Sequence, residues 1–153
     1  MDGGPRLHCP VITGYTISTS KEKLSMLWVC QQLRASYWGG WLTDEQIIAA
    51  CGRSLCFGVY GDDVIDGGEI ALCGEQVAFG RVVTDGHTFS SVMDIIVEEK
   101  CRNQGIGTML MNAMLEHPDV KGTVCIISTQ DKGFWYEKFG FETCPIVLKR
   151  DPK

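Results

Sequence analysis

The sequence contains no apolar run long enough to cross a membrane and no excess of basic residues. A membrane-spanning helix needs about 20 consecutive apolar residues. Nucleic-acid-binding domains present a basic face, whereas this chain has a formal net charge of −5 and a pI near 5.1. Residues 1–6 also lack the apolar core of a secretory signal. We therefore expect a cytoplasmic protein with neither a nucleic-acid nor a membrane partner, and the acidic balance is compatible with an amine substrate.

Cysteine pairs of the metal-binding kind are also missing. None of the eight cysteines belongs to a Cys-x-x-Cys pair. The nearest two, Cys51 and Cys56, have no histidine at zinc-ligand spacing, so we expect no metal. Most cysteines lie in apolar runs, where a free thiol behaves as a small hydrophobic group. We expect reduced thiols.

The chain is long enough for one domain with a substantial core, at 153 residues and 44% hydrophobic content. Residues 1–10 are rich in Gly and Pro, and we expect a loose N-terminal segment there. Residues 11–153 are expected to form a single domain. Residues 61–76 are glycine-rich and acidic, which predicts a surface loop or an extended hairpin; the acids do not match the spacing of an EF-hand calcium loop.

Hydrophobic periodicity and capping signals predict a mixed order of strands and helices. Strands are expected at 11–18, 55–60, 77–84, 87–97, 123–129 and 143–149. Helices are expected from a capping box at 19–22 to about 35, from a second capping box at 43–46 to about 51, from about 105 to 117, and from 131 to 139. This order indicates an α/β fold (an α+β mixed sheet). The sheet is mostly antiparallel, and one right-handed crossover makes a parallel pair of 91–97 with 123–129.

Residues 97–108 join a strand to a helix through a glycine-rich turn, which is a geometry that binds phosphate. The first N–H groups of a helix lack intrahelical partners and carry partial positive charge. Gly105 and Gly107 let a pyrophosphate approach the backbone, and Arg102 adds a cation. The turn is not a dinucleotide-binding turn, because Leu110 replaces the third glycine. It is not a P-loop either, because Gly-Lys-Ser/Thr is absent.

The pattern that fits, Arg-x-x-Gly-x-Gly at 102–107, resembles the acetyl-CoA-binding loop of the GNAT N-acetyltransferases. About 30 residues downstream, Phe-Trp-Tyr-Glu-Lys-Phe-Gly-Phe at 134–141 resembles the late motif of the same family. The resemblance covers most of the chain from residue 12 to 148. It implies about four helices and a splayed parallel strand pair between which pantetheine inserts, with acetyl-CoA as acyl donor. Two departures from the family are Glu99, where many members have Pro, and Cys101, where many have Tyr or an apolar ring.

The resemblance assigns the cofactor contacts. Backbone amides of the loop would hold the pyrophosphate, and a backbone N–H near 95–97 would polarise the thioester oxygen. The expected cofactor-binding residues are Ile95, Ile96, Val97, Arg102, Asn103, Gln104, Gly105, Ile106, Gly107, Thr108, Thr129 and Asp131.

Two residues are candidates for proton transfer. Tyr136 matches the family's general acid, which protonates the leaving CoA thiolate; the alternative is a core tyrosine. Asp94 is the only acid in an apolar strand, and burial of a carboxylate is costly unless the group is paired or has a function. It is a candidate general base, acting directly or through water; the alternative is a structural carboxylate bonded to backbone or to Arg81.

Candidate acceptor residues come from three places. Tyr37, Trp38 and Trp41 surround a Gly-Gly break, and in GNAT proteins this connection overhangs the acceptor; alternatively one or two of these rings belong to the core. Aromatic walls stack on an apolar or aromatic amine, or attract a cation. Arg81 is expected to line the acceptor site or to pair with Asp85, and Ser91 to help hold a water.

The sequence therefore predicts direct transfer of an acetyl group from acetyl-CoA to a primary amine of a small molecule. A protein or peptide N-acetyltransferase and a non-catalytic acyl-CoA-binding module remain as alternatives. The family resemblance also allows a homodimer.

Overall fold

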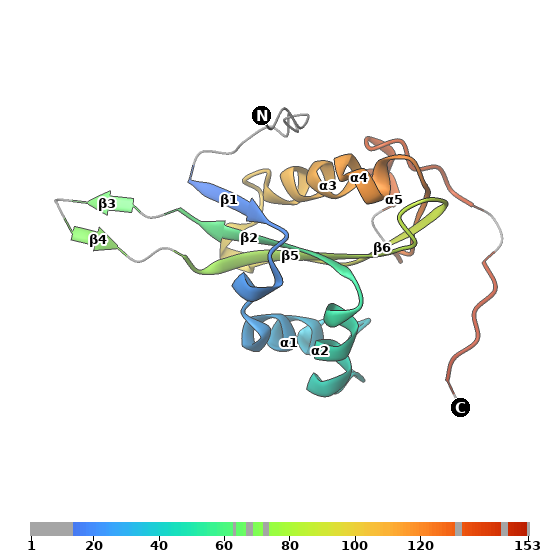
Figure 1. Ribbon diagram of the computed structural model, residues 1–153, viewed down its shortest axis with the longest axis horizontal. Helices are drawn as coiled ribbons and strands as arrows, with labels where there is room; N and C mark the ends of the chain where they lie inside the picture. Colours follow the sequence, from blue (N-terminus) through green and yellow to red (C-terminus); the bar gives the residue numbers. More distant parts are fainter. Residues whose placement is uncertain are drawn as a thin grey trace.

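The computed structural model describes residues 14–62, 64–66, 69–71, 74–130, 133–144 and 147–152. A mixed five-stranded sheet runs through the described part in the order β1-β2-β5-β6-β7 (Figure 1). Its strands are β1 (Tyr15–Ser18), β2 (Leu55–Gly61), β5 (Gln76–Thr84), β6 (Phe89–Val97) and β7 (Val124–Ile127). Only β6 and β7 are parallel, and the other neighbouring pairs are antiparallel. The predicted mixed sheet with one parallel pair is confirmed.

Helices cover both faces of the sheet, as Figure 1 shows. One face carries α1 (Met26–Ala35) and α2 (Asp44–Gly52), and the other carries α3 (Ile106–Glu116), α4 (Pro118–Lys121) and α5 (Gly133–Glu137). Each face has its own hydrophobic core. Phe79 of β5 packs with α1 and α2, whereas its neighbour Ala78 packs with the α3 side. This division follows from the alternation of side chains along a strand.

The helix expected from the capping box at 19–22 begins later than predicted. Lys21–Lys23 form only a 3-10 turn (η1), and Ser20 makes no capping hydrogen bond. Ser25 caps α1 instead, because its side chain accepts a hydrogen bond from the Trp28 N–H at 3.3 Å. The second capping box is confirmed: Thr43 Oγ1 accepts a hydrogen bond from the Gln46 N–H, and Gln46 Oε1 accepts one from the Thr43 N–H.

The last predicted strand is wrong for the residues that can be checked. Residues 143–144 and 147–149 form neither helix nor strand, and 145–146 lie outside the described residues. Val147 and Leu148 are 78% and 94% exposed, so no neighbouring strand buries them. Pro at 145 lacks the N–H that a strand ladder requires, which the apolar pattern alone does not reveal.

Smaller differences concern the ends of two elements and one additional helix. The helix expected at 131–139 ends at Glu137, and 131–132 lie outside the described residues. The strand expected at 11–18 is observed as Tyr15–Ser18; Gly14 belongs to a turn, and 11–13 lie outside the described residues. The sequence does not predict helix α4, because Pro118 also marks the end of the preceding helix. Pro118 occupies the first position of α4, where proline fits. Within 61–76, β3 (Val64–Asp66) pairs antiparallel with β4 (Glu69–Ala71), which confirms the extended-hairpin alternative.

Two features are absent from the described residues. None of their helices is both long and apolar enough to span a bilayer. The same residues hold no cluster of three or more His, Cys, Asp or Glu side chains suited to a metal ion.

Candidate active site

Strand β6 carries a bulge at Asp94. Phe79 of β5 faces Ile96, but Arg81 faces Met93, so β6 has one residue more than β5 over this span. Asp94 has a φ of 57°, in the left-handed region that Asp and Asn tolerate better than most residues. The bulge therefore reorients the strand at the residue that the sequence singled out as a lone acid.

Beyond the bulge, the outer edge of β6 is open within the described part of the chain. Strand β7 pairs with β6 from Phe89 opposite Val124 only as far as Val92 opposite Ile127. The two parallel strands thus separate before the end of β6. This is the predicted splay, and it leaves backbone groups at the edge without a strand partner.

The alternation of backbone groups shows which amides face this gap. The Glu98 N–H donates to the Val77 carbonyl of β5 at 2.7 Å. Since successive residues of a strand point their N–H groups to opposite sides, Val97 and Ile95 direct theirs to the open edge. In agreement, the Val97 carbonyl accepts a hydrogen bond from Arg102 Nε at 3.1 Å, outside the sheet.

The glycine-rich turn leads from this edge into α3. Gly105 is the N-cap residue with a φ of 85°, and no side chain caps the helix. Asn103 also has a positive φ, 62°. Arg102 and Gln104 are exposed, and Gln104 Oε1 accepts a hydrogen bond from the Tyr15 hydroxyl at 3.1 Å. The first-turn amides of α3 are consequently accessible to an anion, with Arg102 beside them.

The two sequence motifs meet in the structure. A Cβ on Gly107 would lie 3.4 Å from Cζ2 of Trp135, so α5 packs close to the first turn of α3. Lys138 Nζ donates to Thr108 Oγ1 at 3.1 Å and lies 4.8 Å from the centre of the Trp135 ring. Lys138 therefore adds a positive charge beside the N-terminus of α3.

Tyr136 lies on α5 and is 9% exposed. Its ring stands edge-on to Trp135 at 4.9 Å and to Phe141 at 6.1 Å between centroids. These contacts fix the phenol on the same side of the sheet as α3, which also carries the anion-accessible amides.

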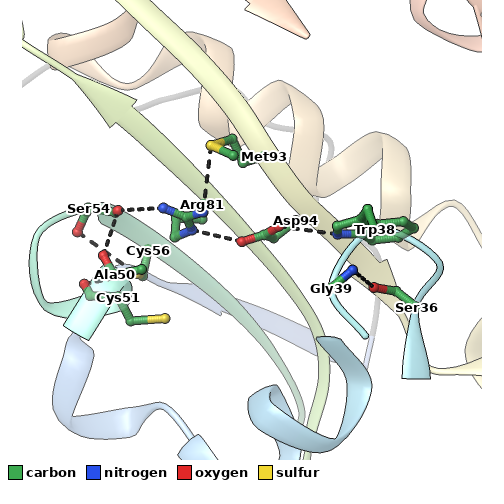
Figure 2. A network of polar contacts seen from close by, with 10 residues as sticks. All are labelled: Ser36, Trp38, Gly39, Ala50, Cys51, Ser54, Cys56, Arg81, Met93 and Asp94. Carbon is green, nitrogen blue, oxygen red and sulfur yellow. Dashed lines mark hydrogen bonds and ion pairs between the residues drawn. The ribbon is translucent and has the colours of Figure 1, made fainter. Parts of the chain in front are cut away.

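On the opposite face, Asp94 joins a polar network with Arg81 and Trp38 (Figure 2). Its Oδ2 accepts from Arg81 Nε at 2.8 Å, and its Oδ1 accepts from Trp38 Nε1 at 3.2 Å. The two ionic side chains are only 6% and 11% exposed, for Asp94 and Arg81 respectively. Arg81 also donates to Ser54 Oγ at 3.0 Å and approaches Met93 Sδ at 3.6 Å. The expected alternative, a structural bond from Arg81 to Asp94, is therefore present.

The expected pairing of Arg81 with Asp85 is wrong. Asp85 instead accepts hydrogen bonds from the backbone N–H groups of His87, Thr88 and Phe89 and from the Thr88 hydroxyl, closing the turn before β6. These bonds hold the pKa of Asp85 well below its ordinary value, and the bond from the Thr88 hydroxyl has the largest effect. Distance along the sequence does not show whether Asp85 or Asp94 pairs with Arg81. The turn decides, because it already engages the Asp85 carboxylate.

The three rings of the segment between α1 and α2 are exposed. Tyr37, Trp38 and Trp41 are 60%, 38% and 66% exposed, so none is a core residue. Tyr37 packs edge-on to Trp38 at 4.8 Å, and Trp41 Nε1 donates to the Trp38 carbonyl at 3.1 Å. Through the Trp38–Asp94 hydrogen bond, this segment lies over the bulge.

The cysteines nearest the network are buried, and Cys51 is in addition held as a neutral thiol. Cys51 and Cys56 are 4% and 1% exposed. The hydrogen bond to Cys56, together with burial, raises the pKa of Cys51, which keeps it a neutral thiol. Only the thiolate is strongly nucleophilic.

The remaining predicted site residues lie as follows. Ile96 pairs with Phe79 of β5 and is buried toward α1. Its backbone therefore faces β5 and not the gap, in contrast to the expectation that it contacts the cofactor. Ser91 is half-buried and lies on the α1–α2 face. Thr129 follows β7 beyond its last paired residue. Asp131 lies outside the described residues.

Several residues near the site were not predicted. Glu98 ties the end of β6 to α1, because it accepts hydrogen bonds from Trp28 Nε1 at 2.7 Å and Gln32 Nε2 at 3.3 Å. It follows the apolar strand directly, and that position was a usable signal. Ser54 and Met93 have no sequence signal, since each acts only through the spatially adjacent Arg81.

Comparison with known proteins bears on this arrangement. Residues 55–143, more than half of the chain, match the family model described as "Acetyltransferase (GNAT) domain". The chain belongs to the GNAT acetyltransferase family. This confirms the family that the two motifs indicated, and acyl transfer is the chemistry of the family.

Several solved structures resemble most of the chain. A protein described as a GNAT-family acetyltransferase from Xanthomonas campestris pv. campestris is 26% identical, with a TM-score of 0.81 over 93% of this chain and 96% of its own. A GNAT-family protein from Streptococcus pneumoniae is 24% identical, with a TM-score of 0.60 over 90% and 99%. N-acetylglutamate synthase from Neisseria gonorrhoeae, solved with coenzyme A and N-acetylglutamate, is 13% identical, with a TM-score of 0.64 over 85% and 28%. No curated protein sequence matches significantly.

Proposed function

We propose that this chain transfers an acetyl group from acetyl-CoA directly to a primary amine of a small molecule. One observation carries the proposal. The open edge of β6 beyond Val92 continues into the uncapped N-terminus of α3, so strand amides and helix amides line one path. Such a path suits an extended acyl donor, with its pyrophosphate at the helix amides and its thioester arm along the strand amides.

The residues along that path fit acetyl-CoA. The amides of the first turn of α3, with Arg102 and Lys138, would hold the pyrophosphate. The outward N–H groups of Ile95 and Val97 would bond the pantetheine arm, and one of them would stabilise negative charge developing on the carbonyl oxygen. When bound, acetyl-CoA supplies an acyl group activated as a thioester.

We assign to Asp94 the orientation of the amine and, directly or through a water near Ser91, the acceptance of its proton. Each carboxylate oxygen can accept two hydrogen bonds, and Arg81 and Trp38 occupy one on each. Asp94 can therefore accept a further proton donor without breaking the network. Arg81 and Trp38 are positioning residues in this scheme.

We assign to Tyr136 the protonation of the leaving thiolate. A phenol has a pKa of about 10, close to that of a thiol, so proton donation is not strongly uphill. The packing of Tyr136 between Trp135 and Phe141 supports this role, because a general acid must be held in one position. Cys51 and Cys56 are both buried, which favours direct transfer over a cysteine-bound acyl group.

Tyr136→Phe tests the proposal against a non-catalytic acyl-CoA-binding module. We expect kcat to fall by about 10²–10⁴-fold, which is typical for loss of a general acid, with the Kd for CoA nearly unchanged by calorimetry. Tyr60→Phe is the matched control, because Tyr60 is also buried but lies on β2. Equal effects of the two changes on kcat, or none, would contradict the assignment.

A further inference from the structure

The sheet face beside Asp94 carries an apolar strip that α1 and α2 leave uncovered. Its five members are partly exposed: Val83 (42%), Phe89 (44%), Met93 (38%), Val124 (68%) and Ile126 (48%). They come from three adjacent strands, β5, β6 and β7.

Strand register places these side chains on one face. Ser91 of β6 lies opposite both Val83 of β5 and Ile126 of β7, and Phe89 lies opposite Val124. Residues directly opposite one another share a face. The intervening residues, such as Val82 and Val92, are buried in the core on the α3 side. The strip therefore crosses the sheet on one face, with the half-buried Ser91 between Val83 and Ile126.

The strip begins at the candidate site. Met93 precedes Asp94, and its Sδ contacts Arg81, which Figure 2 shows beside the Asp94 carboxylate. Trp38, bonded to the same carboxylate, adds a ring at this end. From Met93 to Phe89 the strand extends about 13 Å at roughly 3.3 Å per residue. This length accommodates a ring system with a short side chain.

Charge limits what can occupy the strip. None of its five members is charged, and the carboxylate at its end is already paired with Arg81 at 2.8 Å. A polyamine would need further unpaired carboxylates for its other ammonium groups, and a sugar phosphate would need unpaired cations. Asp85, at the far end, is engaged by its own turn.

We infer that the acceptor carries its amine on an aromatic or large aliphatic group, which lies along this strip while the amine meets Asp94. This inference rests on the proposed function and names its substrate class. The aromatic residues Trp38 and Trp41 then form the wall that faces the ring. Release of water from both apolar surfaces supplies the selectivity.

The test uses phenethylamine, spermidine, glucosamine 6-phosphate and a short peptide with a free N-terminus, each with acetyl-CoA. We expect kcat/KM for phenethylamine to exceed the others by at least about tenfold, the scale of apolar-pocket discrimination. Ile126→Glu should remove that preference. Val147→Glu, an exposed apolar position outside the strip, should keep it.

Binding gives a readout independent of transfer. Phenethylamine, titrated without acetyl-CoA, should change tryptophan fluorescence in the wild type and in Val147→Glu but not in Ile126→Glu. Preference for spermidine, the sugar phosphate or the peptide would overturn the inference and leave acetyl transfer standing. Phenethylamine binding without acetylation of any amine would support the strip and contradict the proposed function. If phenethylamine is neither bound nor acetylated, the inference is overturned.

Discussion

The buried ion pair between Arg81 and Asp94 should be strongly coupled, and a double-mutant cycle measures this. Opposite charges 2.8 Å apart attract by about 6 kcal/mol at an effective dielectric constant of about 20. Desolvation of both groups offsets much of that attraction, but removal of one partner leaves the other buried and unpaired. We expect Arg81→Met or Asp94→Asn to lower the free energy of unfolding by about 3–5 kcal/mol each.

Asparagine is the appropriate replacement at 94, because it tolerates the φ of 57° at the bulge. The variant then tests the charge rather than the backbone. In the double variant the losses should not add, and the coupling energy should be about 2–3 kcal/mol. Urea unfolding followed by circular dichroism measures each corner of the cycle.

The exposed pair Arg34–Asp44 is the matched control. Its atoms are 3.1 Å apart, but the side chains are 56% and 54% exposed. In water the attraction at that distance is about 1.3 kcal/mol before side-chain entropy opposes it, so the coupling should be below about 1 kcal/mol. Equal coupling in the two pairs would refute the argument that burial makes the Arg81–Asp94 pair a structural part of the site.

Three further predictions concern single positions. A Cβ on Gly39 would lie 2.4 Å from the Leu33 carbonyl oxygen, so Gly39→Ala should cost about 1–3 kcal/mol in urea unfolding; Gly40→Ala, whose nearest contact would be 3.4 Å, should cost much less, and equal costs would contradict the packing. The buried Tyr60 hydroxyl has no partner among the described residues, so Tyr60→Phe should leave stability unchanged or raise it by up to about 1 kcal/mol, and a clear loss would reveal a missed bond. Because the folded-state pKa of Asp85 is depressed, its contribution is present above the unfolded pKa of about 3.9 and is lost as pH falls; Asp85→Asn should therefore lose less stability than wild type between about pH 5 and pH 3, and parallel losses would argue against the turn.

Much of the site was predictable because its signals are local. Gly105 and Gly107 at a strand-to-helix junction already define the anion-accessible turn, and the structure confirms the helix start within one residue. Thr43 and Gln46 specify a capping box through neighbouring backbone groups alone. Such features depend on contacts a few residues apart, which the order of residues displays directly.

Features that depend on distant partners were not predictable. Thr19 and Ser25 are both suitable N-caps, and the core packing of Val29 and Leu33 favours the later one. The choice of Asp94 over Asp85 as partner of Arg81 requires the strand register. The exposed 147–148 segment has a strand-like composition, but the described chain offers it no neighbouring strand.

Acetyl transfer by this chain is tested by product analysis of the wild-type protein with acetyl-CoA and a panel of amines. Chromatography with mass detection is preferable to a thiol reagent, because the chain itself contains eight cysteines. We predict an N-acetylated product formed in equal amount to released CoA with at least one class of amine. Calorimetric binding of CoA without acetylated product from any amine would contradict the account and favour a binding module.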